Sequence, residues 1–303
     1  MADTRVNLSG LALDNPVIPA SGTFGFGLEF AELYDINVLG SIALKGTTVE
    51  PRYGNPLPRI AECDSGLINA VGLQNPGVKA VCEEELPALA KVYDKKVIAN
   101  VCGSTENEYV TCAKMLDKAD NVGILEINIS CPNVDCGGME FGRDPETAAK
   151  LTAAIKAAVK KPVYMKLTPN CPDITEVALA CEDAGADGIS MINTLLGTRI
   201  DIRTGRPVIA NVNGGFSGPA VFPVALRMVR DTAEKVDIPV IGIGGIDSAD
   251  KVIEMIMAGA SAVQIGAANL VDPYICRNIA EKLPARMDEL GIKDIDSIRG
   301  CAL

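Results

Sequence analysis

The sequence predicts one α/β domain built as a (β/α)8 barrel. Short apolar runs alternate with amphipathic stretches along the whole 303-residue chain, which is typical of repeated βα units. A polar residue or a glycine follows each apolar run, as happens where the strands of a closed barrel open onto a pocket. No repeat, low-complexity tract or linker divides the chain, so we expect residues 1–303 to form a single domain. An open, doubly wound sheet is the alternative fold.

The predicted barrel strands are eight short runs rich in Val, Ile and Leu, as expected of parallel strands buried on both faces. In chain order they are Pro16–Pro19, Val38–Leu44, Val97–Val101, Ile124–Ile129, Val163–Leu167, Gly188–Ile192, Val240–Ile243 and Ala262–Ile265.

Amphipathic stretches between these runs are the predicted helices. They are Glu106–Ala119, Pro145–Val159, Ile174–Ala184, Ala220–Val236, Ser248–Ala258 and Pro273–Leu290. Asp144-Pro145 and Ser248 mark two helix starts, because proline suits the first helical turn and a hydroxyl can cap its free N–H groups.

Two long segments interrupt the alternation, Thr47–Gly77 and Leu195–Pro219. Both follow predicted strands, so we expect them to be loop insertions at the carboxyl face of the barrel, where long loops are usually functional. Apolar residues within the first segment predict that it is ordered, and the turn sequences of the second predict a small hairpin.

The composition excludes several classes of function. A net charge of -11 and a pI near 4.7 argue against nucleic acid or an anionic membrane as partner. The chain has no membrane-length apolar run and no secretory signal pattern, so we expect a soluble cytoplasmic protein. Its ten cysteines lack the spacing of zinc or iron–sulfur sites, so no metal is expected on this chain. Most, including Cys82, Cys112 and Cys181 in helical patterns, should be reduced small hydrophobes.

The residues just past the strands would ring one pocket if the barrel closes, whereas ordinary turn chemistry is the alternative explanation. They are Ser21, Lys45, Gly46, Asn100, Asn128, Cys131, Lys166, Asn193, Thr194, Gly244, Gly245, Gly266 and Ala267.

Glycines at the ends of the last two strands predict a phosphate site. Gly244-Gly245 and Gly266-Ala267 each precede a helical segment, and barrels commonly bind phosphate there through backbone N–H groups. Lysine is rarely buried without a partner, so Lys166 should face either an anion or a neighbouring carboxylate. If the phosphate belongs to flavin mononucleotide (FMN), Lys166 could stabilise negative charge on the reduced ring.

A thiol is the best candidate for a general base, because the chain contains no histidine and an unperturbed cysteine thiol has a pKa of about 8.5. Cys131 and Cys136 compete for this role. Cys131 follows a strand directly, which fixes its position, whereas Cys136 lies among glycines. We therefore choose Cys131.

The chain resembles the class 1 dihydroorotate dehydrogenases. The segments that carry the resemblance are Asn15–Gly22, Leu44–Thr48, Asn69–Gly77, Asn128–Asn133, Tyr164–Pro169, Met191–Thr194, Gly214–Ala220 and Gly242–Gly245. The resemblance implies an FMN-binding TIM barrel that oxidises dihydroorotate to orotate in pyrimidine biosynthesis.

Two loops, Ser21–Gly27 and Asn133–Gly138, resemble those of the NAD-linked subtype, class 1B. In that subtype the catalytic chain pairs with an electron-transfer subunit that carries FAD and a [2Fe–2S] cluster and passes electrons to NAD+. The resemblance therefore implies a homodimer of this chain within a heterotetramer.

The same resemblance implies the roles of individual residues. Cys131 is the base that takes the C5 proton of the substrate, and the loop Pro132–Gly142 closes over the site. The substrate is held by Lys45, Asn69, Ala70, Val71, Gly72, Leu73, Asn128, Asn133, Asn193 and Thr194. FMN is held by Ser21, Lys45, Gly46, Asn100, Asn128, Lys166, Ile192, Gly218, Gly244, Gly245, Gly266 and Ala267.

Two alternative functions stay open at this point. An FMN enzyme resembling dihydropyrimidine dehydrogenase would keep the flavin but prefer uracil or thymine. A non-enzymatic phosphate-ligand binding barrel would account for the glycines, but not for Cys131 and two lysines at strand ends.

Overall fold

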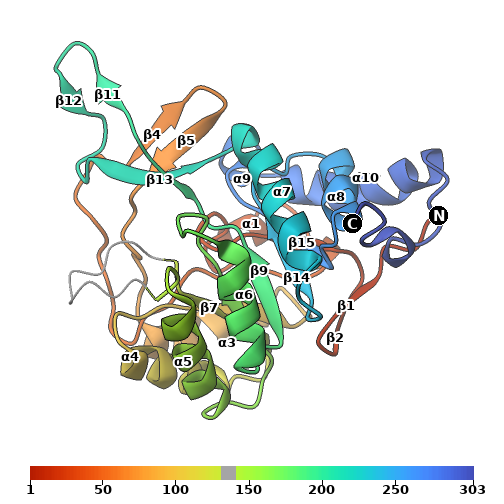
Figure 1. Ribbon diagram of the computed structural model, residues 1–303, viewed down its shortest axis with the longest axis horizontal. Helices are drawn as coiled ribbons and strands as arrows, with labels where there is room; N and C mark the ends of the chain where they lie inside the picture. Colours follow the sequence, from red (N-terminus) through yellow and green to blue (C-terminus); the bar gives the residue numbers. More distant parts are fainter. Residues whose placement is uncertain (131–140) are drawn as a thin grey trace.

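A seven-stranded parallel sheet forms the centre of the computed structural model, which describes residues 1–130 and 141–303 (Figure 1). The strands are buried along nearly their whole length, as expected when helices cover the outer face. In spatial order they are β3 (Val17–Pro19), β15 (Ala262–Ile265), β14 (Val240–Ile243), β9 (Gly188–Met191), β8 (Val163–Lys166), β7 (Val122–Asn128) and β6 (Val97–Val101).

The segment 41–44 lies between the two outer strands of this sheet and closes it into a barrel. The N–H of Ala43 donates to the carbonyl of Pro19 in β3 (3.1 Å), and the N–H of Leu44 donates to the carbonyl of Ile98 in β6 (2.9 Å). Ala43 also forms a parallel bridge with Ile98. The predicted (β/α)8 barrel is therefore confirmed, and the open-sheet alternative is wrong.

The predicted strand Val38–Leu44 starts too early. Val38 ends a 3-10 helix, η1 (Ile36–Val38), which begins where the side chain of Asp35 accepts a hydrogen bond from the N–H of Asn37 (3.0 Å). This capping hydrogen bond holds Ile36–Val38 in a helical turn, although Ile and Val favour strands. Only the residues that hydrogen-bond to both neighbouring strands take the place of the predicted strand.

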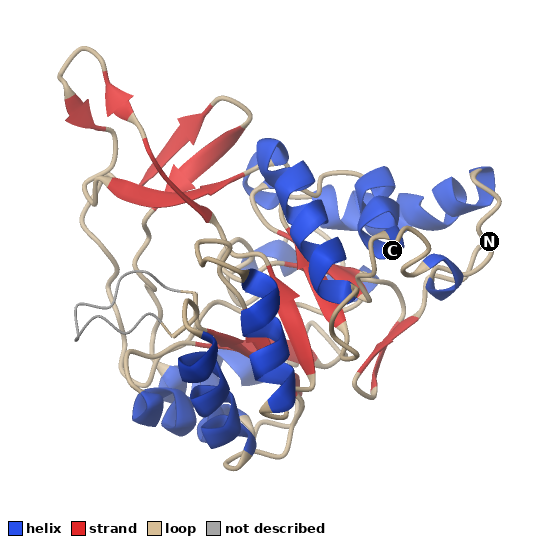
Figure 2. Ribbon diagram, in the orientation of Figure 1, coloured by secondary structure: helices blue, strands red, loops and turns tan. Residues whose placement is uncertain are grey.

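Helices cover the outer face of the barrel at the predicted places (Figure 2). Both predicted caps are present: Asp144 accepts from the N–H of Thr147 (2.8 Å), and Ser248 accepts from the N–H of Lys251 (3.4 Å). The helices that correspond to predictions are α4 (Glu106–Leu116), α5 (Pro145–Lys156), α6 (Ile174–Asp183), α7 (Phe222–Ala233), α8 (Ala249–Met257) and α10 (Ile275–Glu289). Residues Pro219–Val221 form a separate 3-10 turn, η3, before α7.

Several short elements lie outside the predictions. The longest is a helical stretch after the first insertion, which includes a π-helical turn and continues the βα alternation. These elements are β1 (Val6–Leu8), β2 (Leu11–Leu13), α1 (Leu28–Ala31), α2 (Val78–Ala80), η2 (Val81–Glu85), α3 (Leu86–Leu89), α9 (Ala268–Val271) and η4 (Asp296–Ile298). The β1–β2 hairpin lies at the amino-terminal end of the barrel strands, where Ser9 donates to the carbonyl of Asp187 (2.8 Å), just before β9.

The two predicted insertions are ordered, and together they form an antiparallel sheet that projects from the barrel (Figure 1). Its order is β10 (Leu195–Thr198), β13 (Asn213–Ser217), β5 (Gly66–Asn69) and β4 (Ile60–Cys63), and a hairpin of β11 (Ile200–Asp201) and β12 (Arg206–Pro207) extends from it. The predicted hairpin is confirmed, whereas the pairing of the two insertions through β5 and β13 was not predicted.

One large apolar core fills the space between the barrel strands and the helices, and a small second cluster of Ile68, Ala70 and Ile209 lies under the projecting sheet. Across residues 1–130 and 141–303, no helix has both the length and the apolar character needed to cross a membrane.

The closing segment provides a test of the fold. Ile42 is fully buried, and truncation to alanine leaves a cavity, so Ile42→Ala should lower the free energy of unfolding by ~2–5 kcal/mol. Leu196 on the projecting sheet is 57% exposed, and Leu196→Ala should change it by less than ~0.5 kcal/mol. Chemical denaturation of both variants measures the difference, and equal losses would contradict closure by this segment.

Candidate active site

Residues at or next to the ends of three neighbouring strands bring polar side chains to the carboxyl end of the barrel. Asn100 lies on β6, Asn128 ends β7 and Lys166 ends β8. Asn128 and Lys166 are register partners across the β7–β8 pair, so their side chains emerge side by side. The predicted convergence of these strand ends is present in the structure.

A buried polar cluster lies inside the barrel at these strands, and Glu126 is at its centre. Glu126 has no exposed surface. Its carboxylate accepts from Asn100 Nδ2 (2.6 Å) and from Gln264 Nε2 (2.5 Å), and Lys166 Nζ lies 3.4 Å from its Oε2. Lys166 Nζ is also 3.4 Å from Gln264 Oε1. Of the two partners expected for Lys166, the structure therefore places a carboxylate beside it.

Two of the predicted substrate residues meet through a hydroxyl that was not predicted. Asn128 Oδ1 accepts from the N–H of Ser130 (3.2 Å) and from its hydroxyl (2.5 Å). Asn193 Nδ2 contacts the same Ser130 oxygen and lies 3.5 Å from Asn128 Oδ1. Asn193 Oδ1 in turn accepts from the N–H of Thr194 (2.8 Å). Because these bonds restrain both amides, the two asparagines present a fixed pair of polar groups.

The projecting sheet carries Asn69 to the same region. Asn69 on β5 pairs with Gly215 on β13, and its Nδ2 donates to the carbonyl of Gly215 (3.4 Å). A side chain on Gly215 would collide with Thr194, so Asn69 and Thr194 both lie against Gly215. The two insertions thus help to build the site as well as to cover it.

The residues after Asn69 pass close to Gly46. Ala70 is buried, Gly72 and Leu73 have φ values of 77° and 56°, and the Leu73 side chain lies 3.8 Å from where a Cβ on Gly46 would be. Positive φ is unusual for leucine. The turn therefore brings Leu73 beside Gly46, consistent with a shared place for the predicted substrate residues Ala70, Val71, Gly72 and Leu73.

Glycines let the backbone approach the pocket where a side chain would obstruct it. A Cβ on Gly46 would lie 2.9 Å from Asn100 Oδ1, which leaves no room for a side chain. At Gly22, beside the predicted residue Ser21, the nearest atom to a Cβ would be Lys45 Nζ at 4.0 Å. Lys45 therefore lies next to an open space beside the Ser21–Gly22 turn.

The predicted phosphate site has unpaired donors. Within the described residues, the N–H groups of Gly245, Gly266 and Ala267 donate no hydrogen bond to the protein. A Cβ on Gly266 would meet only Ala20 at 3.7 Å, so open space lies above this turn. The free N–H groups of Gly266 and Ala267 beside this open space form a suitable cradle for an anion.

The remaining predicted cofactor residues are Ile192, Gly218 and Gly244. Gly244 has a φ of 134°, and a Cβ there would lie 3.6 Å from the side chain of Ile192, whose N–H donates to the carbonyl of Ile243 (3.0 Å). Gly218 has a φ of 125° and packs against Gly66 of β5. Both glycines occupy backbone conformations that other residues rarely adopt.

Four residues that organise the site were missed: Glu126, Gln264, Ser130 and Asn269. Asn269 donates to Thr23 Oγ1 (3.3 Å) and to the carbonyl of Ile265 (2.8 Å), so it ties the first strand-end loop to the last. A signal for two of them was available, because Glu126 and Gln264 are polar residues inside otherwise apolar strand runs. Such residues need a buried partner.

Cys131, Asn133 and Cys136 lie outside the described residues, together with most of the loop Pro132–Gly142. The end of this loop is described at Phe141, whose ring packs edge-on against Tyr109 (5.6 Å between centroids). The Tyr109 hydroxyl donates to the carbonyl of Asn128 (2.7 Å). The loop therefore returns to the barrel beside the strand end that precedes Cys131.

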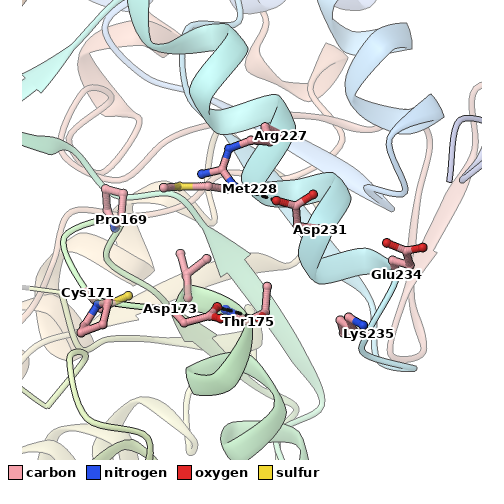
Figure 3. A pocket seen from close by; sticks show the side chains of 11 residues that line it. Pro169, Cys171, Asp173, Thr175, Arg227, Met228, Asp231, Glu234 and Lys235 are labelled. Carbon is pink, nitrogen blue, oxygen red and sulfur yellow. Dashed lines mark hydrogen bonds and ion pairs between the residues drawn. The ribbon is translucent and has the colours of Figure 1, made fainter.

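A surface pocket of about 370 Å³ lies elsewhere, between the start of α6 and the helix α7 (Figure 3). Asp173 caps α6 there, and Arg227 pairs with Asp231 one turn further along α7 (2.6 Å). These charged side chains already have partners within the protein, so the pocket is a weaker candidate for the active site than the strand ends.

The remaining cysteines behave as the sequence predicts. Cys112, Cys181 and Cys276 are buried free thiols, and Cys82 is half-buried. Burial raises the pKa of Cys181 to about 12 and raises the pKa of Cys112 and Cys276 well above the ordinary range.

This burial predicts a pattern of thiol reactivity. Only the thiolate is nucleophilic, and a raised pKa keeps the thiol protonated up to that pKa, so Cys112, Cys181 and Cys276 should resist iodoacetamide in the folded protein at pH 8.5. The exposed Cys301 should be alkylated, and all four should react after unfolding. Peptide mass spectrometry measures each site, and rapid labelling of Cys181 in the folded state would contradict the packing described.

Comparisons with known proteins agree with this geometry. The family model for dihydroorotate dehydrogenase matches residues 4–287. A Bacillus mycoides protein named dihydroorotate dehydrogenase B (NAD(+)), catalytic subunit, is 56% identical over 296 residues, 98% of this chain and 96% of the relative. A protein of the same name from Anoxybacillus flavithermus is 57% identical over 295 residues, 97% of this chain and 94% of the relative. The crystal structure of DHODH from Eimeria tenella in complex with ferulenol has a similar fold, with a TM-score of 0.82 at 21% identity over 99% of this chain and 88% of that one. The chain belongs to the dihydroorotate dehydrogenase family.

Proposed function

We propose that this chain is the FMN-dependent catalytic subunit of an NAD-linked dihydroorotate dehydrogenase, which oxidises (S)-dihydroorotate to orotate in de novo pyrimidine biosynthesis. The observation that carries the proposal is the convergence of Asn100, Asn128 and Lys166 at one end of the barrel, in a chain 56% identical to catalytic subunits of that name. The whole chain, residues 1–303, would act as one FMN-binding domain.

The residues present fit FMN. The unpaired N–H groups of Gly245, Gly266 and Ala267 suit its phosphate, since backbone donors beside open space bind anions. Lys166 and Asn100 lie where polar groups could meet the ring, and FMN, when bound, accepts the hydride from C6 of the substrate. Ser21, Gly46, Ile192, Gly218 and Gly244 would complete the binding surface.

The substrate is a cyclic amide with a carboxylate, and it needs both donors and acceptors. Asn69, Asn128 and Asn193 supply amide groups that can donate and accept at once, and Lys45 supplies a positive charge. The hydrogen bonds among Asn128, Ser130 and Asn193 support this assignment because they fix the amides before the substrate arrives. Asn133 and Thr194 would complete the set.

Cys131 would be the base that removes the C5 proton. It directly follows Ser130 in the sequence, and the hydroxyl of Ser130 is held between the proposed substrate residues Asn128 and Asn193. The loop Pro132–Gly142 would close over the site and exclude water from the thiol.

An electron-transfer subunit would complete the path to NAD+. The names of the relatives describe a catalytic subunit of an NAD(+) enzyme, which implies a separate partner chain. We propose that this partner carries FAD and a [2Fe–2S] cluster and that two copies of each chain form a heterotetramer.

The role of Cys131 predicts the effect of replacing it. Cys131→Ser should retain bound FMN but slow flavin reduction by dihydroorotate by about 10²-fold or more, because a hydroxyl is a much weaker base and general-base catalysis typically contributes 10²–10⁴-fold. The measurement is anaerobic stopped-flow absorbance at saturating dihydroorotate.

Cys136→Ser is the matched control, since it makes the same change in the same loop. It should leave the rate within a few-fold of the wild-type value. A large loss in Cys136→Ser with normal reduction in Cys131→Ser would assign the base to the other thiol.

A further inference from the structure

Glu126 and Lys166 stand apart from every other charged residue that the structure describes. In residues 1–130 and 141–303, Glu126 is the only acidic side chain and Lys166 the only basic side chain that is buried. Removing two charges from water is costly, and apolar residues of similar size often stabilise a core as well or better. A role beyond folding would explain why this barrel contains the pair.

The amides around Glu126 are oriented so that both of its carboxylate oxygens accept hydrogen bonds. The ammonium of Lys166 can only donate, so the Gln264 atom facing it is Oε1, and Nε2 must face Glu126. Asn100 Oδ1 accepts from the Cys102 thiol (3.4 Å), so its Nδ2 faces Glu126. Both carboxylate oxygens therefore meet N–H donors, and a proton on either would point at a donor.

Lys166 is held without being fully engaged. Its two contacts, to Glu126 Oε2 and Gln264 Oε1, are both 3.4 Å long, whereas charged N–H···O bonds are typically about 2.7–2.9 Å. An ammonium has three N–H groups, so a donor remains for a ligand at the carboxyl end of β8.

We infer that Glu126 is a positioning residue, which holds the Lys166 ammonium in place for the flavin ring. The inference rests on the proposed function, because it needs FMN beside Lys166. Reduction adds negative charge to the ring, and a cation held nearby stabilises that charge. Gln264 and Asn100 orient the carboxylate, so the four residues act as one unit.

The FMN midpoint potential, measured by anaerobic dye equilibration, tests this inference because a merely structural role would leave it unchanged. Glu126→Gln removes the counter-charge that holds the ammonium, so Lys166 should no longer be fixed beside the flavin ring. The potential should then shift in the negative direction, as it should in Lys166→Met. A direct field effect of Glu126 has the opposite sign, because loss of an anion makes reduction easier.

A double-mutant cycle separates the two mechanisms further. In a Lys166→Met background there is no ammonium for Glu126 to hold, so adding Glu126→Gln should not shift the potential further in the negative direction. Glu254→Gln, an exposed change on α8, is the matched control and should have no effect. If Glu126→Gln does not retain FMN, Glu126→Asp replaces it in the test. The aspartate side chain is one methylene shorter, so its carboxylate lies farther from Lys166, and the potential should show a smaller shift of the same negative sign.

A positive shift, an unchanged potential, or equal negative shifts in both backgrounds would overturn the inference. These outcomes leave the proposed function intact as long as dihydroorotate reduces the wild-type flavin. A wild-type chain that binds FMN but is not reduced by dihydroorotate would instead contradict the proposed substrate.

Discussion

Closure of the strand ring is the constraint on which the rest of this structure depends. The segment 41–44 hydrogen-bonds to β3 on one side and to β6 on the other, so the carboxyl ends of all strands face one space. Without closure, Lys45 and Gly46 would lie at an edge, far from Lys166 and Gly266. The asparagines, lysines and glycines can cooperate only because this short, irregular segment completes the barrel.

The projecting sheet is the second element that shapes the site. Its strands come from insertions more than a hundred residues apart in the sequence, joined by the β5–β13 pairing. That pairing sets Asn69 beside Gly215 and Thr194. In the proposed enzyme, substrate recognition would be shared between the barrel strands and a sheet outside the barrel.

The sequence was most informative where apolar runs end at glycine. The bounds of β14 and β15 match their predictions, because Gly244 and Gly266 directly follow the last apolar residue of each strand. It was less informative where local and long-range interactions compete, as at Val38, which a cap at Asp35 places in a 3-10 turn. Glu126 was missed because its partners, Asn100, Lys166 and Gln264, lie on other strands, and no local pattern encodes a contact between strands. The residue assignments at Cys131 and Asn133 stay predictions.

The most direct test is the anaerobic absorbance spectrum of the purified chain before and after addition of dihydroorotate. We expect an oxidised flavin spectrum that bleaches on addition, because this chain would hold both FMN and the groups that bind and deprotonate the substrate. A flavin that stays oxidised with dihydroorotate but bleaches with dihydrouracil would contradict the substrate. A colourless protein that cannot be reconstituted with FMN would contradict the account as a whole.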